Sequence, residues 1–157
     1  EFNIPYEYLM SLIQLECSGL KPAGDRFEPH VYRQLKKVQV GSLENYENVT
    51  ASHLYDASDE AIINLATSWG PFQLMGYKCI LLDVKIRDIR GPNGVHYGTQ
   101  WINLTYGNRL RKAEYKHCFH LHNTGKLYPS TGLPTTHDPQ YVQRGLSGLK
   151  RFSTPNN

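Results

Sequence analysis

Two glutamates stand where a carboxyl group could carry out acid–base chemistry. Glu16 continues an apolar stripe formed by Leu9, Leu12 and Ile13, at the position where the next core residue is expected. It also falls in the last turn of that predicted helix, so burial and the helix dipole both disfavour its ionised form. A carboxyl group that stays protonated near neutral pH can act as a general acid. The alternative is a glutamate at the edge of the stripe that reaches solvent.

Glu28 is the contrasting carboxyl group. It directly precedes Pro29, so it is expected at the N-terminus of a second helix, where the dipole favours the ionised form. Two carboxyl groups pushed in opposite directions are the pattern of acid–base glycoside chemistry, with Glu16 as the acid and Glu28 as the base. Asp25 is a second candidate for the base. Taken alone, Glu28 is better explained as a residue that caps its helix.

The elements expected to position these residues are mainly helices. Helices are predicted from Pro5 to Gly19, from Pro29 through Leu35, from Ser58 or Asp59 through Ala66, over residues 77–89, 99–111 and 112–122, and from Asp138 to about Arg151. Residues 90–98 contain the breaker Gly-Pro-Asn-Gly and are predicted to form a turn or short hairpin. The predicted fold class is mainly α with little β structure.

Length and composition favour one folded domain. The chain has 157 residues, of which 39% are hydrophobic and 20% are charged. No run approaches the 18 or so apolar residues of a transmembrane helix, so no membrane span is expected. The net charge of +3 is spread along the chain, which argues against a nucleic-acid partner but suits attraction to an anionic polymer such as a bacterial wall.

Five short segments contain motifs in a consistent order. They are residues 15–19 (LECSG), 26–32 (RFEPHVY), 66–76 (ATSWGPFQLMG), 119–125 (FHLHNTG) and 141–144 (YVQR). Together they resemble the lysozyme-like superfamily of goose-type lysozymes and lytic transglycosylases. The segment 66–76 is the most specific, because it closely matches the S-W-G-x-F-Q-[IL]-M-G box of phage and bacterial N-acetylmuramidases.

The resemblance implies a lysozyme-like domain over residues 1–152. Residues 153–157 are polar and contain a proline, so they are predicted to form a linker-like tail. It implies cleavage of the β-1,4 bond between MurNAc and GlcNAc in peptidoglycan glycan strands, without a metal or cofactor, and with Glu16 protonating the glycosidic oxygen. The phenylalanine–glutamate box favours hydrolysis with Glu28 as a second carboxylate. The single signature glutamate, Glu16, favours a lytic transglycosylase that forms 1,6-anhydroMurNAc ends.

The resemblance also implies a substrate site in the same cleft as Glu16. Its residues are Gln73, Trp69, Phe72, Tyr77, His122, Asn123 and Tyr141. Gln73 offers amide donors and an acceptor to sugar groups. The aromatic side chains of Trp69, Phe72 and Tyr77 would exclude water from the acid. His122 departs from the tyrosine usual in this superfamily, but it can still donate a hydrogen bond or orient Glu16.

Other interpretations stay open. A zinc-dependent wall endopeptidase would use His117, His120 and His122, with His53 and Asp56 as upstream ligands. A wall-binding module without catalysis and an amidase with a cysteine nucleophile are further alternatives. The three cysteines are expected to be mostly buried and reduced, with at most one bridge. We expect the domain to belong to a larger protein that acts on the wall from a phage virion, as a lysin or after secretion.

Overall fold

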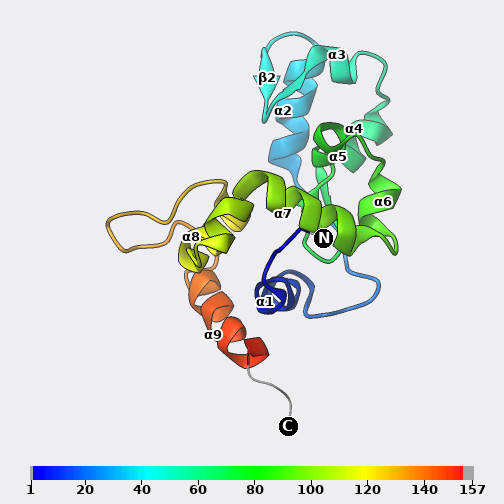
Figure 1. The fold of residues 1–157 in the computed structure, drawn as a ribbon. Coiled ribbons are helices and arrows are strands. Elements are labelled where there is room, and N and C mark those ends of the chain that lie inside the picture. The colour runs from blue at the N-terminus through cyan, green and yellow to red at the C-terminus, as the bar shows by residue number, and fades with distance from the viewer. Residues whose placement is uncertain (1, 154–157) are drawn as a thin grey trace. The chain divides into compact units, whose positions relative to one another are not determined.

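The computed structural model describes residues 2–153 and is mainly helical, as predicted. The chain forms two compact units (Figure 1). Unit 1 combines the N-terminal segment through Gly19 with the chain from Thr99 onward, and unit 2 is Leu20–Gly98. Within the described residues, no helix is both long enough and apolar enough to cross a membrane. Of the predicted tail, Ser153 ends the last helix and residues 154–157 lie outside the described range.

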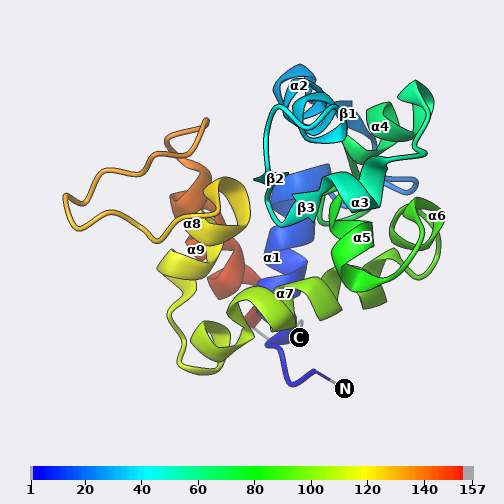
Figure 2. The ribbon, with the colours of Figure 1, turned by 90° about the horizontal axis from the view of Figure 1, so that it is seen from above.

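Unit 1 is built around two helices that lie side by side (Figures 1 and 2). Its helices are α1 (Tyr6–Cys17), α8 (Tyr115–Thr124), α9 (Tyr141–Ser153) and the part of α7 (Gly94–Arg111) that follows Gly98. The Ser11 hydroxyl on α1 donates to the carbonyl oxygen of Gly145 on α9 at 2.7 Å. A Cβ atom at Gly148 would lie only 2.3 Å from Ser11 Oγ. The two backbones therefore approach closely because α9 carries glycine at this contact.

Helix α1 ends as the sequence predicts. Ser18 and Gly19 both adopt left-handed backbone conformations, with φ of 53° and 73°. The N–H of Ser18 donates to the carbonyl oxygen of Gln14 at 3.2 Å and closes the last turn. Tyr8, Ser11, Leu12 and Cys17 are the buried residues of the helix. Glu16 therefore lies in the last turn of a helix whose inner face is buried, as predicted.

His120 on α8 ties the following loop to that helix. Its side chain is fully buried. The backbone N–H of Thr135 donates to Nε2 at 3.1 Å, so Nε2 is an acceptor and the neutral ring carries its hydrogen on Nδ1. Nδ1 lies 2.7 Å from the carbonyl oxygen of Lys126, to which it donates. One imidazole thus ties residues 126 and 135 of the following loop to α8.

His120→Phe is expected to loosen this loop and destabilise the protein. The ring keeps its bulk but loses both backbone partners, which costs about 1–3 kcal/mol of unfolding free energy. Denaturant unfolding measures the cost, and limited proteolysis between residues 126 and 135 measures the loosening. The matched control is His137→Phe, since His137 is exposed in the same loop. Equal stability of the two variants would contradict the role given to His120.

Unit 2 combines short helices with two small antiparallel sheets. Its elements are β1 (Arg26–Phe27), α2 (Pro29–Gln39), β2 (Asn45–Tyr46), β3 (Val49–Thr50), α3 (Ala51–Leu54), α4 (Asp59–Leu65), β4 (Thr67–Trp69), β5 (Leu74–Met75), α5 (Lys78–Leu82) and α6 (Ile86–Arg90). One sheet has the order β1-β4-β5, with Arg26 opposite Ser68 and Ser68 opposite Met75. The other sheet is the β2–β3 hairpin. Val31, Leu35, Val38, Val49, Leu54, Ile62, Ala66 and Tyr77 form the core.

The structure predicted for two segments of unit 2 is wrong. The helix expected over residues 77–89 is split into α5 and α6, because Asp83 adopts a left-handed conformation with φ of 54° and ends α5. The turn or hairpin expected over residues 90–98 gives way to helix at Gly94, where α7 begins. The breaker sequence therefore marks only the gap between α6 and α7.

Two helix boundaries in unit 1 also differ from the prediction. The helix expected over residues 112–122 is α8, which begins at Tyr115 and ends at Thr124. The last helix, expected from Asp138, begins at Tyr141. Asp138 Oδ1 accepts the N–H of Gln140 at 2.9 Å, which holds residues 138–140 in a turn before α9.

Candidate active site

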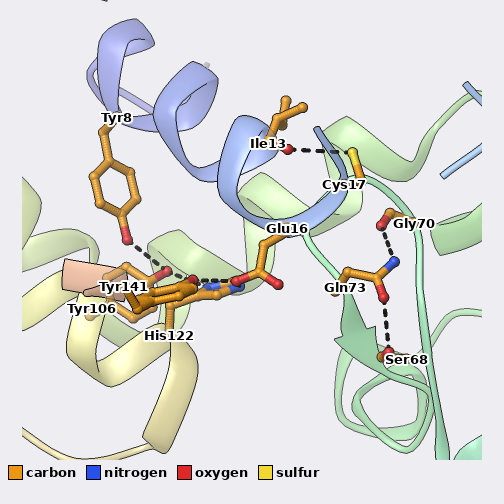
Figure 3. Close-up of polar contacts among 10 residues, drawn as sticks. All are labelled: Tyr8, Ile13, Glu16, Cys17, Ser68, Gly70, Gln73, Tyr106, His122 and Tyr141. Carbon is orange, nitrogen blue, oxygen red and sulfur yellow. Dashed lines mark hydrogen bonds and ion pairs between the residues drawn. The ribbon is translucent and has the colours of Figure 1, made fainter. Parts of the chain in front are cut away.

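A cluster of polar side chains in unit 1 surrounds the carboxyl group of Glu16 (Figure 3). Its members, the Glu16 cluster, are Tyr8 and Glu16 from α1, Tyr106 from α7, His122 from α8 and Tyr141 from α9. The Glu16 side chain is 16% exposed. The carboxyl group is therefore largely enclosed but still open to a reactant.

Tyr141 binds the carboxyl group directly. Its hydroxyl donates a hydrogen bond to Glu16 Oε1. Burial raises the pKa of Tyr141 well above its ordinary value, and the adjacent Glu16 carboxylate raises it further. Tyr141 thus remains a neutral donor at any pH near neutrality. Because Oε1 is the accepting oxygen, the proton of a protonated Glu16 would sit on Oε2.

The His122 ring lies near the same carboxylate oxygen as Tyr141, and its other ring nitrogen contacts Tyr106. Its Nε2 lies 3.8 Å from Glu16 Oε1, which is too long for a hydrogen bond but close enough for electrostatic attraction. Its Nδ1 lies 2.8 Å from the hydroxyl oxygen of Tyr106. The Tyr8 hydroxyl in turn donates to Tyr106 at 3.2 Å. Tyr8, Tyr106 and His122 therefore form a series of polar contacts that ends at Glu16.

Of the residues predicted from the sequence, Glu16, His122 and Tyr141 come together in this cluster. The expectation that His122 would stand near Glu16 agrees with the structure. Tyr141 was expected to contact substrate, but its hydroxyl binds Glu16. Asn123, expected to support the site, is exposed near the end of α8. Its role stays a prediction.

Tyr8 and Tyr106 belong to the site without being part of any of the five sequence motifs. Tyr8, Leu12 and Glu16 are spaced by four residues, so they share one helix face, and a buried tyrosine hydroxyl there needs a partner. That spacing could have identified Tyr8. Tyr106 lies at a kink in α7, where its φ of −146° departs from helical values. Gly107, which directly follows, is a local signal for a kink, but it does not identify Tyr106 as a member of the site.

The Gln73 amide group makes three hydrogen bonds within unit 2. Oε1 accepts the Ser68 hydroxyl at 3.0 Å, and Nε2 donates to the carbonyl oxygens of Gly24 at 2.7 Å and Gly70 at 3.1 Å. Both amide hydrogens are therefore engaged within the protein. A sugar could use only the remaining lone pair of Oε1 unless these bonds open. The predicted substrate-binding role of Gln73 is reduced accordingly.

The aromatic residues of the 66–76 motif and its C-terminal side do not act alike. Phe72 is 1% exposed and Tyr77 is 7% exposed, and Tyr77 belongs to the core of unit 2. Little of either ring is accessible for direct contact with a sugar, and their expected place in the wall that excludes water from Glu16 stays a prediction. Trp69 is half-buried, with Nε1 donating to the carbonyl oxygen of Asn64 at 2.9 Å and the Arg90 guanidinium 5.0 Å from its ring. Its role stays a prediction.

Glu28 occupies the N-cap position of α2, but its side chain makes no capping hydrogen bond. Its carboxylate instead pairs with Arg26, which contacts Oε1 through both Nε and a terminal nitrogen. The backbone N–H of Glu28 donates to the carbonyl oxygen of Ala66 at 2.9 Å and joins α2 to the end of α4. Capping therefore does not explain this carboxyl group.

The zinc alternative loses its central ligand. Both ring nitrogens of His120 are engaged by the loop after α8. Within residues 2–153, histidine, cysteine, aspartate and glutamate side chains form no group of three or more that could hold a metal ion. All three cysteines are buried and none forms a disulfide, as expected. Cys17, the nucleophile of the amidase alternative, donates its thiol hydrogen to the carbonyl oxygen of Ile13 at 3.4 Å.

Alkaline pH is expected to destabilise the folded protein. Burial raises the pKa of Tyr8, Tyr106 and Tyr141 well above the value of about 10 for an unfolded tyrosine. Below that pH both states are protonated, and the stability is fully present. Above it the unfolded chain releases protons that the folded protein keeps, so the unfolding free energy falls as pH rises. Urea unfolding followed across this range, with tyrosinate absorbance as the second probe, measures the effect. An unfolding free energy that stays constant above pH 10 would contradict it.

The Glu16 cluster lies within unit 1 and combines three residues of the sequence motifs, Glu16, His122 and Tyr141, with two tyrosines outside them. No family model, curated protein or solved structure gives a match to this chain.

Proposed function

We propose that this chain is a peptidoglycan glycosidase that cleaves the β-1,4 bond between MurNAc and GlcNAc, with Glu16 as the general acid. The observation that carries the proposal is the enclosed Glu16 carboxyl group, held at Oε1 by the Tyr141 hydroxyl. The order of the five motifs supports the substrate class. The proposal includes a lysozyme-like fold, with which a mainly helical chain and a small sheet in the 66–76 motif are consistent.

The surroundings of Glu16 suit an acid that must give its proton away. Oε2 carries the proton to the glycosidic oxygen, and the leaving proton leaves a negative charge on the carboxylate. The Tyr141 hydroxyl already donates to Oε1 and strengthens its bond as this charge develops. His122 presents a ring nitrogen to the same oxygen at 3.8 Å. Both groups are in place before the reaction, so they need no reorganisation during it.

For hydrolysis, a second carboxylate must activate water, and Glu28 is the candidate. Both contacts from Arg26 reach Oε1 of Glu28, which leaves Oε2 to accept a proton from water. The Glu28 side chain is 29% exposed, so water can reach it. Asp25, which is exposed, is the second candidate for this role. Attack by the activated water would release a reducing MurNAc end.

A lytic transglycosylase is the second candidate function. The observation that favours it is that the Glu16 cluster contains a single carboxyl group. In that mechanism Glu16 first protonates the glycosidic oxygen and then accepts the proton of the MurNAc 6-hydroxyl, which attacks the anomeric carbon. The product is a 1,6-anhydro end, formed without water.

Mass spectrometry of muropeptides released from purified peptidoglycan tests both functions. Hydrolysis gives reducing MurNAc ends, whereas transglycosylation gives 1,6-anhydro ends that are lighter by one water. The control reaction uses the protein with Glu16→Gln. The proposal fails if the wild-type protein releases no glycan fragments, or if the fragments carry GlcNAc at the new reducing end.

A further inference from the structure

We infer that Tyr106, itself held by Tyr8, is a positioning residue that keeps His122 in one tautomer, with its N–H on Nε2 and facing Glu16. The catalytic consequence of this inference rests on the proposed function, because it concerns the same carboxyl group. The tautomer itself does not, since it follows from hydrogen bonds inside unit 1. Figure 3 shows the Tyr8 hydroxyl pointing to Tyr106, and Tyr106 beside the His122 ring.

The tautomer follows from counting protons. The Tyr8 side chain is fully buried, and its hydroxyl donates to the hydroxyl oxygen of Tyr106 at 3.2 Å. A phenol has one hydrogen, so Tyr106 accepts from Tyr8 and has its own hydrogen to give. His122 Nδ1 lies 2.8 Å from the Tyr106 oxygen, within reach of that hydrogen, and is assigned as its acceptor. A neutral imidazole whose Nδ1 accepts carries its hydrogen on Nε2.

Burial keeps the phenols of Tyr8 and Tyr106 protonated, as this series of hydrogen bonds requires. Tyr106 is 6% exposed and Tyr8 is inaccessible to solvent. Burial raises the pKa of both well above the ordinary value, so both keep their hydrogens near neutral pH. The ring of Tyr8 also packs against Phe119 and Tyr115, with ring centroids 4.7 Å and 6.3 Å away. Packing therefore fixes the position of Tyr8, the first donor in this series of hydrogen bonds.

The consequence falls on the carboxyl group. With the hydrogen on Nε2, His122 directs a donor toward Glu16 Oε1, the oxygen that also accepts from Tyr141. Nε2 lies 3.8 Å from Oε1, which is beyond hydrogen-bond distance, and the electrostatic attraction of its N–H to that oxygen becomes stronger when the carboxylate is charged. The opposite tautomer would aim the lone pair of Nε2 at Oε1 and repel that charge. The identity of the donor on His122 thus depends on Tyr106.

The first test is a direct measurement of the tautomer. Nitrogen-15 NMR of the histidine ring distinguishes hydrogen on Nε2, hydrogen on Nδ1 and the doubly protonated ring. In the wild-type protein at neutral pH we expect His122 to carry its hydrogen on Nε2 alone. Tyr106→Phe removes the donor to Nδ1, and we expect a mixture of tautomers. Tyr115→Phe is the matched control, because Tyr115 packs on Tyr8 in the same unit, and it should leave the His122 spectrum unchanged.

The second test separates positioning from a structural role. Loss of a hydrogen bond of this kind is expected to lower kcat on purified peptidoglycan about fivefold in Tyr106→Phe, with KM little changed. In a His122→Phe background the same change should cost nothing more, because Tyr106 acts through His122. Tyr115→Phe should again match the wild type.

The outcomes are distinct from those that test the proposed function. Hydrogen on Nδ1 or a doubly protonated His122 in the wild-type protein would overturn the inference without any reference to activity. Equal kcat losses from Tyr106→Phe with and without His122 would overturn its catalytic part. If the tautomer is as expected while Glu16→Gln keeps full activity, the positioning of His122 stands and the assignment of Glu16 as the acid is the part that fails.

Discussion

Glu16→Gln is expected to abolish cleavage of peptidoglycan while leaving the fold intact. The amide has the size of the acid and its oxygen can still accept the Tyr141 hydroxyl, but it has no acidic proton to give. General acid catalysis contributes about 10²–10⁴-fold, so turnover should fall by that factor. Release of soluble fragments from purified walls measures turnover, and thermal unfolding measures stability.

The control for this change is Glu7→Gln. Glu7 is the other glutamate of α1 and lies in its first turn, where a carboxylate interacts favourably with the helix dipole. The substitution should cost less than about 1 kcal/mol of stability and leave turnover unchanged. Near-normal cleavage by the Glu16 variant would show that another residue is the acid. A Glu16 variant that no longer folds would be recognised by its unfolding curve.

Glu28→Gln is expected to remove hydrolysis almost as fully as Glu16→Gln. An amide cannot accept the proton of the attacking water, so the loss should again reach about 10²–10⁴-fold. The effect on stability should be small, below about 1 kcal/mol, because the side chain makes no capping hydrogen bond and its partner Arg26 is exposed. A large loss of activity with little loss of stability is therefore the distinguishing result.

Asp25→Asn is the matched control for Glu28, because Asp25 is a neighbouring exposed carboxylate and the second candidate for the base. If only the Glu28 change stops hydrolysis, Glu28 is the base. If only the Asp25 change does, the role passes to Asp25. If neither variant loses turnover and the products carry 1,6-anhydro ends, the hydrolase proposal is wrong and the lytic transglycosylase replaces it.

The sequence by itself predicted the features that depend on local pattern. The stripe of Leu9, Leu12 and Ile13 predicted α1, and Gly19 as its stop signal placed Glu16 in the last turn. Helix periodicity and stop signals act within a few residues, so they can be recognised along the chain. The mainly helical class followed from the same signals. They were less reliable around Asp83 and Gly94, where one left-handed residue and one helix start changed the boundaries.

The motif residues show where local pattern stops being informative. Three residues fall in or beside the same motif. Phe72 and Tyr77 are buried, whereas the Gln73 amide nitrogen donates to backbone carbonyl oxygens. Residue type alone does not tell whether a polar or aromatic side chain meets substrate or its own protein. That choice depends on what packs against each side chain, which is a property of unit 2 as a whole.

Only the tertiary structure could decide how the Glu16 carboxyl group is held. Tyr141 reaches it from 125 positions along the chain, and Tyr8 meets Tyr106 across 98 positions. No local signal specifies such pairs, because they exist only once α1, α7, α8 and α9 have packed together. The sequence placed a carboxyl group at the end of a helix and a histidine in a distant motif. Packing brought them within 3.8 Å and put two buried phenols behind the histidine, since buried hydroxyls must find partners among whatever side chains the fold brings near.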